Sequence, residues 1–185
     1  KELIKKIELH DKFKEFISTG GKDKLFNDVN LVKLKDNTRS KTSNLIIFDA
    51  DSIAKDPNNG GFEKRKKQIE EIKSDFIKFE LFLFPNNKDE GDFEVLLENI
   101  INPNHKVLLD CFKKYETCIS KDNSDKYQKP IRKAKMYSYI DAFKKTNNQN
   151  QEFKKGNYFF NNSEYWDLDN AYLNPLKNFL KENIN

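Results

Sequence analysis

The chain has 185 residues, of which 35% are charged, and its 34 basic and 30 acidic residues give a formal net charge of +4. This length suits one domain with its own core and is short for two full-sized domains. A mean hydropathy of -0.90 would fit a disordered chain, but 16 Phe and 7 Tyr residues in periodic apolar patterns exclude that class. The two cysteines, Cys111 and Cys118, are expected on one helix face as small core residues. Without a signal peptide or an apolar stretch of about eighteen residues, we expect a soluble cytoplasmic protein with no membrane partner.

The first part of the chain carries a helical pattern. Apolar residues at three- and four-residue spacing predict an amphipathic helix over residues 1–17 that covers a face of a sheet. A second short helix is expected over residues 22–26, and residues 35–44 are expected to form a polar loop.

The most informative stretch is residues 44–52. The run Leu45–Phe48 is continuously apolar and bounded by turn-forming residues, which predicts a buried strand of a parallel sheet. Asp49 and Asp51 follow at the carboxyl edge, where α/β proteins bind ligands, and both leave the same side of an extended segment. Two carboxylates placed in this way predict half of a Mg²⁺ or Mn²⁺ site. The alternative is that two acids end a strand and cap the next helix.

A second strand follows after one helix. The pattern predicts a helix over residues 62–76 and a buried strand over residues 78–84. Strand, crossover helix and strand make a βαβ unit, whose two strands are parallel. The loop 85–92 should therefore emerge near Asp49 and Asp51.

The next helix, predicted from residue 92 or 93 to about residue 101, begins among four acids: Asp89, Glu90, Asp92 and Glu94. Asp92 is a good N-cap candidate, and acids in a first turn are stabilised by the helix dipole. However, crowded like charges are costly unless a cation offsets them. We therefore expect a metal role for at least one of these acids and favour Asp92 or Glu94, with capping as the alternative.

The rest of the chain is expected to be helical. Helices are predicted over residues 106–119, 130–143 and 170–184, with a polar loop at 121–129 and a flexible Asn/Gln-rich segment at 144–151. Aromatic residues between Tyr158 and Trp166 are expected to pack this part onto the preceding domain. The predicted organisation is an α/β domain over residues 1–120 and a helical, aromatic-rich C-terminal extension over residues 121–185.

Together these motifs resemble the Toprim superfamily of topoisomerases, primases, ribosomal-RNA maturases and overcoming-lysogenization-defect nucleases. The resemblance rests on the apolar strand ending in Asp49 and Asp51, and on the segments 82–87 and 91–97, which look like those of an uncharacterised bacterial Toprim-like family. It covers roughly residues 44–120. It implies a central, mostly parallel sheet with helices on both faces.

One departure concerns the general base. Toprim enzymes use a glutamate at the end of their first strand, usually followed by Gly, and no such segment precedes Asp49 here. Two explanations stay open: the first strand and its glutamate lie upstream of Lys1, or the site is catalytically degenerate.

The resemblance implies metal-assisted phosphoryl transfer on nucleic acid. Asp49 and Asp51 would hold Mg²⁺ or Mn²⁺, with Asp92 or Glu94 as further carboxylates. Three basic residues after the first acidic loop are candidates to meet nucleic-acid phosphates, with a solvated basic face as the alternative: Lys64, Arg65 and Lys67. A homo-oligomer or a phage-defence partner is also in keeping with such a protein.

Two other hypotheses remain. Residues 46–52 also resemble the nucleophile motif of haloacid-dehalogenase-like phosphatases, in which Asp49 would attack phosphorus and Asp51 would act as acid and base. That motif normally lies near the N-terminus, and its later Gly-Asp-x-x-x-Asp is not completed by residues 91–96. The other hypothesis is a Toprim-like interaction module without catalytic activity, in which the acids are structural.

Overall fold

The computed structural model of the chain describes residues 1–122 and 126–184, and its elements are a mixture of helices and two parallel strands. The chain forms two compact units, one of residues 1–96 with 171–185 and one of residues 97–170. The predicted division into residues 1–120 and 121–185 stays a prediction. The coarse α/β class predicted from the sequence is confirmed by the parallel strands and the helices around them.

The first unit holds both strands and most of the helices near them. Its α-helices and strands are α1 (Glu2–Lys6), α2 (Lys22–Leu25), α3 (Asp28–Arg39), β1 (Leu45–Asp49), α4 (Phe62–Glu70), β2 (Glu80–Phe84) and α9 (Asn174–Asn183). Two 3₁₀ turns, His10–Lys12 and Ala171–Leu173, belong to the same unit, and α5 (Phe93–Asn99) begins in it.

The two strands are parallel and connected through α4, as the sequence predicted. Their register pairs Leu45 with Glu80 at one end and Asp49 with Phe84 at the other. Both strands are mostly apolar, and side chains of the sheet are buried on both of its faces. On one face, Ile46 and Leu83 join a buried cluster with Ile69 of α4.

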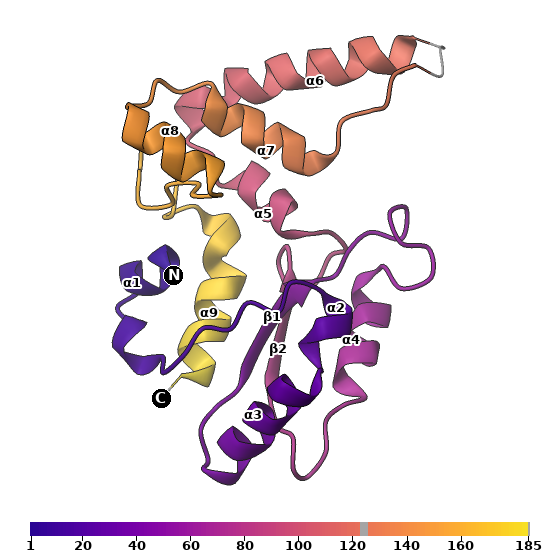
Figure 1. Cartoon of the computed structure of the whole chain (residues 1–185), viewed down its shortest axis with the longest axis vertical. Coiled ribbons are helices and arrows are strands. Elements are labelled where there is room, and N and C mark those ends of the chain that lie inside the picture. The colour runs from indigo at the N-terminus through magenta and orange to yellow at the C-terminus, as the bar shows by residue number, and fades with distance from the viewer. Residues whose placement is uncertain (123–125, 185) are drawn as a thin grey trace. The chain divides into compact units, whose positions relative to one another are not determined.

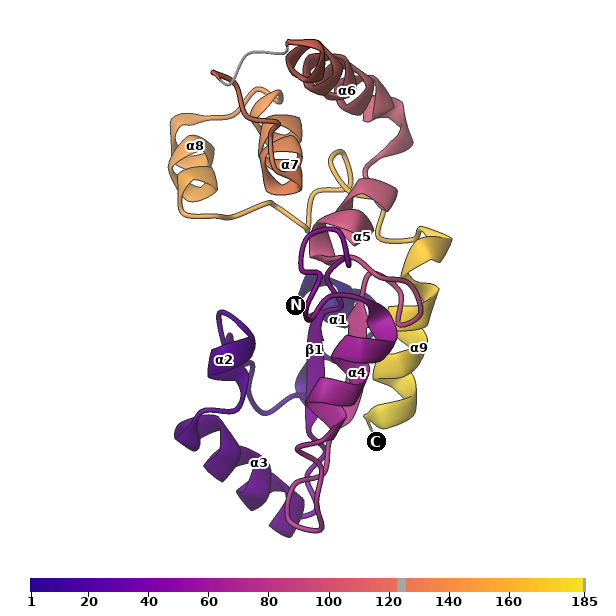
Figure 2. The ribbon, with the colours of Figure 1, turned by 90° about the vertical axis from the view of Figure 1, so that its right-hand side faces the viewer.

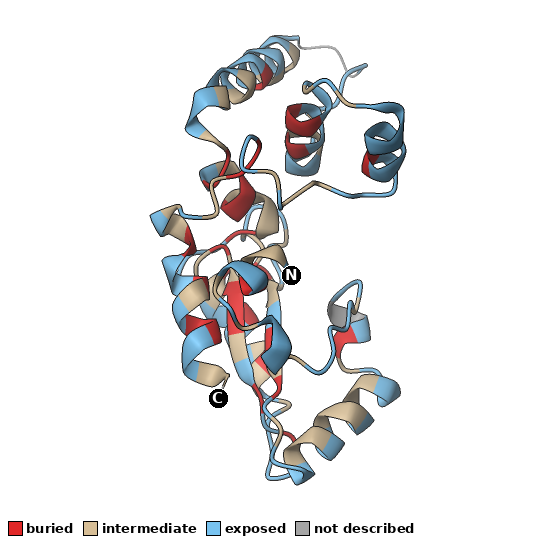
Figure 3. Cartoon of the chain, turned by 90° about the vertical axis from the view of Figure 1, so that its left-hand side faces the viewer, coloured by how far each residue is buried: buried red, intermediate tan, exposed pale blue. Residues whose placement is uncertain are grey.

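On the opposite face, the fully buried ring of Phe82 packs against Phe179 of α9, with 5.4 Å between the ring centroids. Figure 1 shows α4 and α9 on opposite sides of the strands. In Figure 3 buried residues lie along the strands, which places the core of this unit at the sheet.

A buried asparagine fixes the start of β1. The side-chain amide of Asn44 donates to the carbonyl oxygens of Leu34 (3.1 Å) and Lys78 (2.9 Å), and its oxygen accepts from the amide of Asn37 (2.8 Å). These bonds join β1 to α3 and to the residues just before β2. Asn44 is 8% exposed, so its polar groups need these partners.

The N-terminal part differs from the prediction. A single helix over residues 1–17 is wrong, because α1 ends at Lys6 and Glu8 adopts a positive φ of 60°, which no helix residue can have. The polar loop predicted from residue 35 is also wrong over its first half, because α3 extends to Arg39. An N-cap starts α3, since the side chain of Asn27 accepts from the N–H of Asn30 at 2.9 Å.

The second unit is helical. Its α-helices are α6 (Lys106–Lys121), α7 (Arg132–Asp141) and α8 (Asn147–Lys154), and a 3₁₀ turn at Pro103–His105 precedes α6. Figure 2 shows α7 between α6 and α8. The rings of Tyr137 on α7 and Phe153 on α8 stack at 4.4 Å. The predicted polar loop 121–129 includes residues 123–125, which lie outside the described residues.

Two predictions for this unit are wrong. The Asn/Gln-rich segment 144–151 is not a flexible loop, because Thr146 and Gln149 form a capping box that starts α8. The cysteines Cys111 and Cys118 are free and exposed, so they are not core residues.

The aromatic cluster of residues 158–166 packs within the second unit. The indole of Trp166 is 1% exposed and lies 5.5 Å from the ring of Tyr139 between centroids. The hydroxyl of Tyr139 donates to the carbonyl oxygen of Tyr165 at 2.6 Å. Among the helices that the structure describes, none is both long and apolar enough to cross a membrane.

Candidate functional site

The candidate site begins where β1 and β2 end side by side. Asp49 is in register with Phe84, and the N–H of Ala50 donates to the carbonyl oxygen of Phe84 at 3.2 Å. Because the strands are parallel, the loops that follow them leave the same edge of the sheet. The structure thus brings residues 49–51 together with residues 91–94, as the sequence predicted for the two loops.

The carboxyl group of Asp49 is held at the end of β1. Its Oδ1 accepts from the backbone N–H of Phe93, the first residue of α5, at 2.9 Å. Burial raises the pKa of Asp49 to about 6, against the opposing effect of that N–H, and the charges of Asp51, Glu94 and Asp92 raise it further. Four carboxyl groups therefore interact at the end of β1.

The backbone at Asp51 ties the two loops together. Asp51 has a positive φ of 54°, and its carbonyl oxygen accepts the N–H groups of Gly61 (3.2 Å) and Gly91 (3.1 Å). Gly91 itself has a φ of 147°, a backbone conformation that only glycine adopts at little cost in free energy. The close approach of the loops to Asp51 therefore depends on glycine at these points.

A substitution at Gly60 tests how tightly the loop between Asp51 and α4 is packed. A Cβ at Gly60 would lie 2.7 Å from the carbonyl oxygen of Asp56 and closer still to that of Ser52. We expect Gly60→Ala to lower the free energy of unfolding by about 3 kcal/mol, because backbone atoms must move to admit the methyl group. Urea denaturation followed by circular dichroism measures this.

The control for Gly60→Ala is Gly20→Ala, since no atom lies within 4 Å of a Cβ at Gly20 and only its φ of 70° opposes the change. That variant should lose about 1 kcal/mol. Equal losses at the two positions would show that the loop around Gly60 is not close-packed.

The side chain of Asp51 is paired with two cations. Its Oδ1 accepts from Nζ of Lys55 at 2.8 Å, and its Oδ2 accepts from Nη2 of Arg65 at 3.1 Å. Nζ of Lys55 also lies 3.8 Å from Oδ2 of Asp92, so an ammonium group stands between two carboxylates. The pairing with Asp51 raises the pKa of Lys55, while 61% of its side chain is exposed.

Arg65 is the buried cation of the site. Its side chain is 3% exposed and pairs with Asp51 and, at 3.5 Å, with Asp56. Its Nε has no hydrogen-bond partner within the described chain. Of the three residues predicted to meet nucleic acid, Lys64 and Lys67 are exposed on α4, whereas Arg65 points into the fold and orients Asp51.

The acids of the second loop have separate roles. Asp92 is 7% exposed and its Oδ1 accepts from the N–H of Val95 at 3.2 Å, which is the capping contact that the sequence analysis gave as the alternative to a metal role. Glu94 is half-buried and contributes to the charge around Asp49. Glu90 instead accepts from the N–H of Ile53 at 3.1 Å and holds the two loops together.

The oxygen ligands of this edge suit a hard divalent cation in their chemistry, since Mg²⁺ is bound through one or two carboxylates plus water. Within residues 1–122 and 126–184, however, no three His, Cys, Asp or Glu side chains are arranged to hold a metal ion. The ammonium group of Lys55 lies between two of these carboxylates, 2.8 Å from Asp51 and 3.8 Å from Asp92.

Sequence reasoning missed Lys55 and the inward position of Arg65. Lys55 follows Asp51 by four residues, a spacing at which opposite charges can meet in a turn or helix, so a signal for it was present. No comparable signal marked Arg65, since it stands among three other basic residues of α4.

The chain was also compared with known proteins. No curated protein and no solved structure matches it significantly. One family model matches residues 1–185, and its description is "Protein of unknown function (DUF3226)". Because this match spans all of the residues given, the chain belongs to the DUF3226 family.

Proposed function

We propose that this protein performs Mg²⁺-dependent phosphodiester chemistry on nucleic acid, as a nuclease-like member of the Toprim superfamily. The observation that carries the proposal is the set of four interacting carboxyl groups at the carboxyl end of β1, with the pKa of Asp49 raised to about 6. A carboxyl group whose pKa is perturbed by burial and by neighbouring charges is typical of functional centres. In this proposal β1 and β2 belong to a Toprim-like, mostly parallel sheet.

Each side chain of the site has a part in the proposed chemistry. Asp49 and Asp51 would hold Mg²⁺ or Mn²⁺, with Asp92 and Glu94 as further oxygen ligands. The bound ion would polarise the scissile phosphate and stabilise the leaving oxygen. Arg65 keeps the carboxylate of Asp51 in one orientation, and Lys55 balances the negative charge until a divalent cation displaces it. Lys64 and Lys67 are candidates to meet nucleic-acid phosphates through their exposed ammonium groups.

A cleavage assay tests the proposal. Purified protein is incubated with supercoiled plasmid or structured RNA and Mg²⁺ or Mn²⁺, beside the Asp49→Ala and Asp51→Ala variants. We expect the wild type to cleave at least one substrate and each variant to lose at least 100-fold in rate, since each removes an ion ligand. The control is Asp36→Ala, which removes an exposed carboxylate of α3 and should leave the rate unchanged.

Lys55→Met gives a second arm of the same assay. Removing the ammonium between Asp51 and Asp92 should lower the Mg²⁺ concentration that is needed for half-maximal cleavage. Cleavage that is equal in the wild type and the Asp49→Ala variant, or absent under both metals, would refute the proposal. Metal-dependent hydrolysis of p-nitrophenyl phosphate without nucleic-acid cleavage would instead assign Asp49 to the phosphatase hypothesis.

A further inference from the structure

The outer edge of β1 has unpaired backbone groups. The N–H of Glu80 donates to the carbonyl oxygen of Asn44, and the N–H of Ala50 donates to the carbonyl oxygen of Phe84. The even-numbered residues of β1 therefore direct their backbone N–H and C=O groups toward β2. In a parallel ladder the intervening residues direct their N–H and C=O groups to the opposite side. Within the described chain, no backbone or side-chain group bonds to Leu45 or Ile47 on that side.

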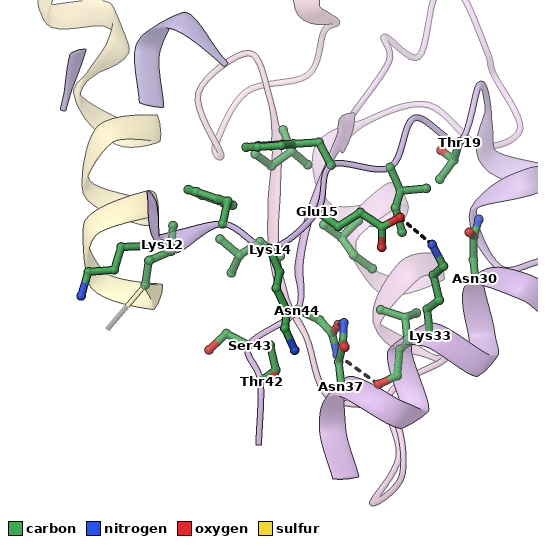
Figure 4. A pocket seen from close by; sticks show the side chains of 18 of the residues that line it. Lys12, Lys14, Glu15, Thr19, Asn30, Lys33, Asn37, Thr42, Ser43 and Asn44 are labelled. Carbon is green, nitrogen blue, oxygen red and sulfur yellow. Dashed lines mark hydrogen bonds and ion pairs between the residues drawn. The ribbon is translucent and has the colours of Figure 1, made fainter. Parts of the chain in front are cut away.

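A cavity of about 970 Å³ lies along this edge. One wall is β1 and another is the non-helical segment 13–17, as the close-up in Figure 4 shows. Three large apolar side chains that line the cavity are exposed: Phe16 (45%), Ile17 (48%) and Ile47 (37%). An added strand would cover two features of this edge: its exposed apolar side chains and its unpaired backbone N–H and C=O groups.

The positive charge of the residues that line the cavity favours an acidic binding partner. Four lysines line it, Lys12, Lys14, Lys33 and Lys41, against one acid, Glu15. Glu15 is already neutralised by Lys33, since its Oε1 lies 2.7 Å from Nζ. A second copy of the chain would bring the same lysines to the same edge and be repelled. An acidic segment would be attracted.

We propose that the free edge of β1 binds an extended segment of a partner protein, with apolar residues at alternate positions and acidic residues at both ends. The segment adds a strand to the sheet through backbone bonds to Leu45 and Ile47, as in other β-augmentation complexes. Its apolar side chains cover Phe16, Ile17 and Ile47. The proposed bonds are made to Leu45 and Ile47, which precede Asp49 on β1, and they do not depend on the function proposed for the carboxylates.

The probe is the capped peptide Ac-Glu-Glu-Val-Thr-Val-Thr-Val-Glu-Glu-NH₂, titrated into the full chain by calorimetry and by NMR. We expect saturable binding and slowed amide exchange at Leu45 and Ile47. Two further peptides carry N-methyl groups on alternate residues, one set on the odd and one on the even positions. Because a strand pairs through one edge, one of them should bind at least tenfold more weakly while the other binds like the parent.

The matched protein variant reverses the rim charge with Lys12→Glu, Lys14→Glu and Lys41→Glu, three exposed side chains, and circular dichroism checks its fold. We expect it to lose at least tenfold in affinity for the acidic peptide and to gain affinity for a lysine-flanked peptide of the same core. Absence of binding at millimolar peptide, equal binding of all three peptides, or self-association of the chain that occupies this edge would each overturn the proposal.

Discussion

The Asp49→Asn variant is expected to be more stable than the wild type at pH 7.5 and to have lost any response to Mg²⁺. The carboxyl group has an ordinary pKa of 3.8 and a pKa of about 6 in the folded chain, a difference that corresponds to about 3 kcal/mol. Asparagine retains an oxygen for the N–H of Phe93 and carries no charge. The free energy of unfolding should therefore rise by up to about 3 kcal/mol.

The pH dependence follows from the same difference. Below pH 3.8 the carboxyl group is protonated in both states, so ionisation costs nothing. Between pH 3.8 and about 6 the unfolded state loses its proton first, so the stability of the wild type falls as pH rises. Above pH 6 the cost is constant. Asp49→Asn should remove this fall, and urea titrations at pH 4, 5, 6 and 7.5 measure it.

The effect of Mg²⁺ on thermal stability distinguishes a site that binds a cation from one in which the charge of Asp49 is only destabilised by burial. If Asp49 is a ligand, Mg²⁺ raises the melting temperature of the wild type by binding the folded state, and it leaves that of Asp49→Asn unchanged. The control Asp36→Asn should change stability by less than about 0.5 kcal/mol and keep the response to Mg²⁺. A wild-type melting temperature that is insensitive to Mg²⁺ would contradict the proposed ion site.

Arg65→Met is expected to destabilise the fold strongly. It removes the buried partner of Asp51 and Asp56 and leaves their charges poorly compensated. Loss of one partner of a fully buried pair costs about 3–5 kcal/mol. Because Asp51 keeps Lys55 and is partly exposed, we expect a loss of about 2–3 kcal/mol, measured by urea denaturation at pH 7.5.

A double variant tests the cause of this loss. Asp51→Asn removes a carboxylate with which Arg65 pairs. Arg65→Met should therefore lower the free energy of unfolding by less in the Asp51→Asn background than in the wild type. The matched single control is Lys64→Met, one residue away and exposed, which should change stability by less than about 0.5 kcal/mol. An equal cost of Arg65→Met in both backgrounds would show that its hydrocarbon packing, and not its pairing with Asp51, stabilises the fold.

The sheet and the gathering of the acids could be predicted because both follow from local patterns. A continuous apolar run of strand length marks β1 and β2, and a single helix between them dictates parallel pairing. Parallel pairing then brings the residues after Asp49 and after Phe84 to one edge. That Asp92 caps α5 was also predictable from its place before an apolar helical pattern.

The N-terminal and Asn/Gln-rich segments could not be predicted from periodicity alone. Residues 1–17 have helical spacing, yet Glu8 adopts a left-handed conformation that no apolar pattern encodes. Residues 144–151 are polar enough to suggest a loop, and α8 forms because Thr146 caps it and Phe153 is buried. The capping box was visible in the sequence as Thr-x-x-Gln, whereas the burial of Phe153 depends on α7.

The pairing within the site depends on long-range geometry. Arg65 reaches Asp51 only because α4 packs beside β2, which turns one of four consecutive basic residues inward. Sequence reasoning treats those residues as equivalent. The same packing makes the inward residue a positioning group and leaves Lys64 and Lys67 exposed.

The buried amide of Asn44 has a consequence at the other end of its strand. Side chains alternate along a strand, so a slip of one residue between β1 and β2 would turn Asp49 to the opposite face. Asn44 bonds to Lys78 and Leu34 and so selects one register from the start of the strand. A single amide roughly 17 Å away thereby helps to align Asp49 with the loop that follows β2, so the placement of the carboxylates depends on contacts made where the strand begins.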